Sequence, residues 1–125
     1  MKIIMFSKKN NKMDTVIGPD SNFIGEIQTK GSLRIDGGVE GNISADWVII
    51  GEKAVIKGDI MSRGVIVGGQ IEGNLYVKEI VEILAMGKVI GDISTSRLSI
   101  TEGGWLNGRT IMQKPESNII ELQAK

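Results

Sequence analysis

The sequence predicts an all-β protein, a single-domain parallel β-helix of about six three-sided coils with a short disordered tail at each end. Two observations predict this fold. A phrase of the form apolar-x-Gly-polar-apolar recurs at six places spaced 15 to 18 residues apart in the 125-residue chain, with Thr110 in the last position of the sixth copy, and a pair of alternating apolar residues stands between successive copies. The repeat of 15 to 18 residues is too short for a pair of helices, and it is long enough for three short strands with tight corners.

The first segment of the chain, residues 1–17, contains no glycine and has a net charge of +3, from four Lys and Asp14. We expect this arm to be disordered. Apolar side chains beside lysines suit an anionic membrane surface, where each Lys contributes about 1 kcal/mol. The predicted membrane-binding residues are Ile3, Ile4, Met5, Phe6, Lys8, Lys9 and Lys12. A solvated leader without a membrane role is the alternative.

The glycines define the domain that follows, residues 18–112, because all 17 lie between positions 18 and 108. Six of them stand at the centre of the repeated phrase, at intervals of 16, 17, 15, 18 and 17 residues. These are Gly25, Gly41, Gly58, Gly73, Gly91 and Gly108. Either the narrow core has no room for a side chain there, or the backbone needs a positive φ. The paired glycines Gly37-Gly38, Gly68-Gly69 and Gly103-Gly104 are typical of corners.

The apolar pairs between the glycine phrases alternate with period two, which is typical of strands with one buried face. The pairs are Leu33 and Ile35, Val48 and Ile50, Val65 and Val67, Val81 and Ile83, and Leu98 and Ile100. The position after the repeat glycine is polar in successive coils. Asn42, Asp59, Asn74 and Asp92 occupy it, and we expect them to form an outward, structural ladder along one side of the solenoid.

Composition and motifs argue against most enzyme classes. Without His or Cys there is no Ser-His-Asp or Cys-His site, and no imidazole or thiolate metal site. The zero net charge gives no general reason to expect nucleic-acid binding, and no phosphate-binding glycine loop is present. We therefore predict no catalytic, cofactor or metal residues. A non-polymerising β-helix binding module or a carboxylate-dependent enzyme is the alternative.

The ends of a β-helix expose unpaired backbone groups and an open core. Neither the arm nor the tail, residues 113–125, is apolar enough to plug both ends, so stacking of copies is expected. The predicted polymerisation residues are Phe23 and Ile24 in the first coil, and Trp105 and Leu106 in the last. The alternative is that they only close the core of their own coils.

Several of these motifs together resemble the bactofilins, a family of bacterial cytoskeletal proteins. The resemblance covers residues 15–112. It rests on the Thr15-Val16-Ile17-Gly18 entry, the Gly-Ser-Leu-Arg-Ile-Asp-Gly stretch at 31–37, the repeated Gly-Asp/Asn-Ile phrases and the Met5-Phe6-Ser7-Lys8-Lys9 leader.

The resemblance implies a right-handed β-helix that polymerises end to end, without nucleotide, into non-polar filaments. It further implies a cytoplasmic scaffold on the inner face of the cytoplasmic membrane, which serves cell-shape or cell-wall proteins. Family members often begin with Met-Phe, so either Met5 is the native start or Ile3 and Ile4 add apolar contact. The family often has an aromatic polymer contact where this chain has Leu106, so either Leu106 or Trp105 makes that contact.

Overall fold

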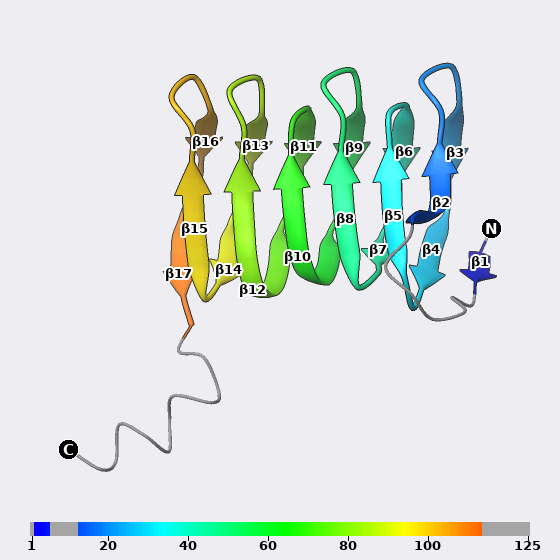
Figure 1. Ribbon diagram of the computed structural model, residues 1–125, viewed down its shortest axis with the longest axis horizontal. Helices are drawn as coiled ribbons and strands as arrows, with labels where there is room; N and C mark the ends of the chain where they lie inside the picture. Colours follow the sequence, from blue (N-terminus) through cyan, green and yellow to red (C-terminus); the bar gives the residue numbers. More distant parts are fainter. Residues whose placement is uncertain (1, 6–12, 114–125) are drawn as a thin grey trace, which may run out of the picture.

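The computed structural model describes residues 2–5 and 13–113, with side chains from residue 15 onward. These residues form seventeen strands and no helix. Figure 1 shows the strands as coils that stand side by side along one axis, with the first coils in blue and the last in orange. Every strand pair is parallel. The predicted all-β parallel solenoid of about six coils is confirmed.

Each coil contributes one strand segment to each of three faces. The first face consists of β2 (Met13–Ile17), β5 (Ser32–Ile35), β8 (Trp47–Ile50), the second halves of β10 (Ile60–Val67) and β12 (Leu75–Ile83), and β15 (Arg97–Ile100). The second face consists of β3 (Asn22–Ile24), β6 (Gly38–Glu40), β9 (Val55–Lys57), β11 (Gln70–Glu72), β13 (Lys88–Ile90) and β16 (Trp105–Asn107). The third face consists of β4 (Glu26–Thr29), β7 (Ile43–Ser44), the first halves of β10 and β12, β14 (Ile93–Thr95) and β17 (Thr110–Met112), with β1 (Lys2–Met5) beside β4.

The core is a stack of aliphatic rows, because residues in register point inward at the same place in each coil. On the second face Val39, Ile56, Ile71 and Val89 form one such row, and each is at most 2% exposed. β-branched side chains have few χ1 rotamers to lose and pack well on a pleated surface, which explains their dominance in these rows.

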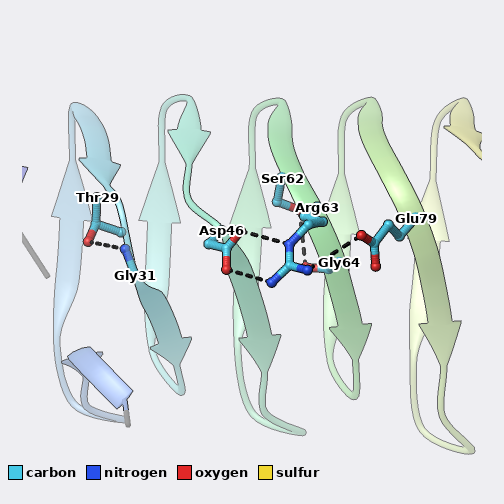
Figure 2. A network of polar contacts seen from close by, with 7 residues as sticks. All are labelled: Thr29, Gly31, Asp46, Ser62, Arg63, Gly64 and Glu79. Atoms are coloured by element: carbon cyan, nitrogen blue, oxygen red, sulfur yellow. Dashed lines mark hydrogen bonds and ion pairs between the residues drawn. The ribbon is translucent and has the colours of Figure 1, made fainter. Parts of the chain in front are cut away.

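The corner between the third and first faces carries small inward side chains, some of them polar. The Thr29 hydroxyl oxygen accepts the Gly31 N–H at 3.2 Å, and the Ser62 hydroxyl donates to the Gly64 carbonyl at 3.1 Å (Figure 2). Thr95 is buried at the same corner and donates to the carbonyl two residues on. The local bonds satisfy these hydroxyls, so they are buried without a large cost.

The repeat glycines all have positive φ, between 142° and 157°. A Cβ built on Gly58 would lie 1.9 Å from the Gly41 carbonyl oxygen, and the other glycines after the first copy meet the preceding repeat glycine in the same way. The obstacle is therefore the backbone of the neighbouring coil along the axis. The structure favours the backbone explanation over a shortage of room in the apolar core.

The side chains that follow the repeat glycines form the expected outward ladder. Their oxygens accept hydrogen bonds from backbone N–H groups of the next coil. Asn42 Oδ1 accepts the Asp59 N–H at 3.2 Å, and Asp59 Oδ1 accepts the Asn74 N–H at 2.9 Å. Asn74 and Asp92 continue the series to the Arg109 N–H. Each side chain thus ties its coil to the next.

Two parts of the N-terminal arm, residues 1–17, are strands that lie beside the first coils. The strand β1 pairs with β4 in the register Lys2↔Glu26, and β2 pairs with β5 through Ile17↔Ile35. The outer edge of the first coil has backbone N–H and C=O groups that need hydrogen-bond partners, and the extended segments of the arm supply these partners. Of the predicted membrane-binding residues, Phe6, Lys8, Lys9 and Lys12 lie outside the described residues.

Candidate assembly surfaces at the two ends of the solenoid

The last coil has neighbours on one side only. Its strands β15, β16 and β17 pair with β12, β13 and β14, and no described residue pairs with their opposite edges. Figure 1 shows them as the outermost strands at the orange end of the solenoid. Their outer N–H and C=O groups form a template for further parallel or antiparallel pairing.

The core is open at this end. Ile100 continues the inward row of Ile50, Val67 and Ile83, which are at most 1% exposed, yet Ile100 is 46% exposed. Met112 follows the fully buried Thr95 in the same way and is 55% exposed. Stacking another apolar surface on this end would remove these side chains from water, at about 25 cal/mol per Å² of apolar area.

The two candidate residues of the last coil point in different directions. Leu106 follows Val89 in the inward row and packs against the core while remaining partly exposed. Trp105 follows Lys88 in the outward row, and the Lys88 Nζ lies 6.0 Å from its ring centroid. Leu106 therefore belongs to the open end of the core, and Trp105 to the rim of the second face.

The first coil presents a related but different end. Phe23 stands in the inward row beside Val39 and packs partly buried against the core, while Ile24 points outward and is 70% exposed. On the third face, β1 lies along β4, where Ile27 is only 2% exposed. The first coil is therefore partly covered where the last coil is open.

The predicted polymerisation residues are not brought together within one molecule. Phe23 and Ile24 lie on β3 and Trp105 and Leu106 lie on β16, which are the two outermost strands of the six-stranded sheet of the second face. Only contacts between copies can bring residues of one end against another end. Their role in polymerisation stays a prediction.

Sequence reasoning missed a polar network at the corner between the third and first faces. Arg63 donates to both Asp46 oxygens at 2.9 Å and to Glu79 at 3.4 Å (Figure 2). The hydrogen bond from Arg63 lowers the pKa of the Asp46 carboxyl group. The same hydrogen bond to Asp46 raises the pKa of the Arg63 guanidinium. Asp46, Arg63 and Glu79 are 17 and 16 residues apart, so the coil period itself could have predicted this network.

The described residues offer little for a metal or catalytic site. No group of three or more Asp or Glu side chains among them is placed to hold a metal ion. The pKa of Asp92 is lowered, first by the hydrogen bond from the Arg109 backbone N–H, which is a structural contact. None of the described segments is a helix of the length and apolarity needed to cross a bilayer.

Known proteins share this solenoid. The family model described as "Bactofilin: Polymer-forming cytoskeletal" matches residues 15–110. Two bactofilins of Myxococcus xanthus (strain DK1622) are similar, BacP with 32% identity over 107 residues and BacO with 31% identity over 113 residues. The matches cover 85% and 89% of this chain, 45% of BacP and 90% of BacO.

A solved structure agrees with the sequence matches. The cryo-EM reconstruction of Thermus thermophilus bactofilin double helical filaments has a TM-score of 0.67 and 23% identity, and the match covers 79% of this chain and 99% of that one. The solenoid with its open last coil therefore has the fold of a bactofilin. On the family match and the two relatives, this chain belongs to the bactofilins, a polymer-forming cytoskeletal family.

Proposed function

We propose that this protein is a cytoskeletal scaffold that self-assembles end to end, without nucleotide, into non-polar filaments. The observation that carries the proposal is the open core of the last coil, where Ile100 and Met112 are exposed in rows that are buried in the central coils. The family description and the filaments of the Thermus thermophilus relative support it.

Like-to-like junctions make the filament non-polar. In such a junction two last coils meet, and two first coils meet at the next junction along the filament. The apolar residues of the last coil, Ile100, Leu106 and Met112, would cover the same residues of the other copy. This arrangement needs no complementarity between the open last coil and the partly covered first coil.

The test of self-assembly is electron microscopy of the purified full-length chain in buffer without nucleotide. We expect filaments whose width matches one or a few solenoids, present equally with and without added ATP or GTP. Particles that remain monomeric over a wide range of protein and salt concentration would overturn the proposal and favour the binding-module or enzyme alternative. In the described part of the chain no observation favours that alternative.

The second part of the proposal places these filaments on the inner face of the cytoplasmic membrane, where they support cell shape or the localisation of cell-wall enzymes. The support is the composition of the arm, with Ile3, Ile4, Met5 and Phe6 followed by three lysines. One arm would bind weakly. A filament that displays many arms would bind firmly, because the effective concentration of the remaining arms is high once one is bound.

The variant Lys8→Glu/Lys9→Glu/Lys12→Glu tests the arm without removing β1, which a deletion of residues 1–12 would also take from the β4 edge. We expect filaments of normal appearance and a loss of co-sedimentation with anionic liposomes of more than about tenfold, since each lysine contributes about 1 kcal/mol. The matched control is Lys53→Glu/Lys57→Glu/Lys78→Glu, which changes three exposed solenoid lysines. Equal sedimentation of both variants would contradict the role of the arm.

A further inference from the structure

The outward side of the first face has a group of apolar side chains at its centre. Its central residues are Trp47 and Ile49 on β8, Ile66 on β10 and Ile80 on β12, all partly exposed. The equivalent outward row of the second face has its apolar residues apart, with Glu40, Lys57 and Glu72 between Ile24 and Ile90. On the third face, the exposed Met61 and Tyr76 stand between Ser44 and Ser94 and beside the Asn/Asp ladder.

We propose that this first face is a lateral contact between two copies of the chain, which pack face to face with their solenoid axes antiparallel. The proposal rests on the proposed function, because it concerns how filaments pair. It commits to a second copy as the occupant. The arguments are the charge pattern of the face and the size of the area that it offers.

The outward row of the first face has opposite charges at equal distances from its centre. In successive coils the row reads Arg34, Ile49, Ile66 and Glu82. Consider a twofold axis that runs parallel to the strands, midway between Ile49 and Ile66. It reverses the order of the coils in the second copy, so each row of one copy faces the same row of the other. It places Arg34 of each copy against Glu82 of the other, and Ile49 against Ile66.

The charged groups of this row can make these contacts. Glu82 is partly exposed and forms no ion pair with any described residue. Arg34 is paired with Asp36 at 2.9 Å, and its side chain is 45% exposed, which leaves further guanidinium donors accessible. An arginine that bridges Asp36 and a glutamate of the second copy would complete a two-carboxylate site at each end of the contact.

The neighbouring rows follow the same symmetry. At the corner, Asp46 and Arg63 occupy the two central coils. The twofold axis therefore places Asp46 of each copy opposite Arg63 of the other. In the next row Trp47 stands opposite the position of Gly64, and the Trp47 ring lies over Gly64, where a Cβ would be 2.4 Å from it. Each ring leans towards the coil of Gly64, so the twofold axis places the two rings side by side.

A parallel orientation of the second copy fits the face less well. A parallel pair with its twofold axis along the solenoid would place Arg34 against Ser32 and Glu82 against Ile80, which leaves buried charges unmatched.

The area explains why the contact belongs to filaments. Four residues per strand and five spacings between six coils give a face of about 13 Å by 24 Å, or roughly 300 Å². A stable isolated complex buries about 800 Å² per partner. One pair of subunits is therefore weak, and two filaments that repeat the contact along their length bind by avidity.

Charge reversal tests the pairing in full-length filaments by electron microscopy. Arg34→Glu and Glu82→Arg each place like charges against one another at both ends of the contact, and we expect about a tenfold or larger fall in the fraction of paired filaments. The double variant Arg34→Glu/Glu82→Arg restores opposite charges, and pairing should return. The control variant Glu40→Arg/Lys57→Glu makes the same reversal on the second face and should pair normally.

Engineered cysteines test the orientation, since the chain contains none. Under mild oxidation a mixture of Arg34→Cys and Glu82→Cys proteins should cross-link, because the two positions face each other. Each variant alone should not cross-link, because the cysteines of the two paired copies then lie about three coils, roughly 14 Å, apart along the solenoid axis.

The outcomes separate the two proposals. Filaments that never pair, cross-links within a single variant, or failure of the double variant to restore pairing would overturn the antiparallel lateral contact. First-face variants that lose liposome binding would assign the face to the membrane instead. Absence of filaments in the unchanged protein would overturn the proposed function, and the lateral contact with it.

Discussion

Gly58→Ala is expected to destabilise the solenoid by more than about 3 kcal/mol. At φ +149° an L-residue is strained, at a cost of about 1–3 kcal/mol. The added Cβ would also lie 1.9 Å from the Gly41 carbonyl oxygen, and a backbone atom cannot move away as a flexible side chain can. Relief requires these two coils to separate, which weakens the hydrogen bonds between them, including Gly41 N–H to the Lys57 carbonyl at 2.9 Å.

Chemical denaturation followed by circular dichroism measures this effect, on protein kept below its assembly concentration. The matched control is Gly18→Ala, because a Cβ there meets nothing within 4 Å. We expect the control to change the free energy of unfolding by about 0.5 kcal/mol or less. Equal stability of the two variants would show that the repeat glycines are not required by the backbone.

Leu106→Arg is expected to stop filament growth at the last coil while leaving the fold intact. The side chain lies at the open end of the core, so an arginine can reach water in the free molecule. In a junction it would be buried without a partner, at a cost of about 3–5 kcal/mol, or roughly 100-fold or more in the affinity of that junction. With like-to-like junctions, the first coils still associate, and the product is a dimer.

Light scattering and electron microscopy distinguish the outcomes. Trp105→Arg should have a smaller effect than Leu106→Arg, because Trp105 points outward at the rim of the end. Tyr76→Arg is the matched control, an aromatic-to-arginine change at a 48% exposed site in the middle of the third face, and it should form normal filaments. Filaments that persist in both Leu106→Arg and Trp105→Arg would contradict the role of the last coil. Monomers in place of dimers would indicate head-to-tail junctions.

Most of the solenoid could be predicted from sequence because its contacts repeat with the period of the chain. The glycine spacing indicated which residues stack, and the ladder from Asn42 to Asp92 followed from the same count. The Asp46–Arg63 network has the same spacing and was predictable in principle. It was missed because its residues are not part of the apolar or glycine pattern.

The ends could not be predicted in the same way, because a residue in the first or last coil lacks one of its two neighbours. The repeat places Leu106 and Trp105 in the last coil. Only the register with Val89 and Lys88 shows that Leu106 closes the core and Trp105 lies on the rim. The strand β1 is a further example, since its sequence reads as a basic arm and its pairing depends on the free edge of β4.

The sequence by itself determined the parallel solenoid, the number of coils and the rows that fill the core, since these follow from periodicity and from the burial of β-branched side chains. The tertiary structure decided why the repeat glycines are needed, which end is open and which polar side chains bridge neighbouring coils. These properties depend on edges and on the direction of side chains between coils, which are set by hydrogen bonding between segments far apart in the chain.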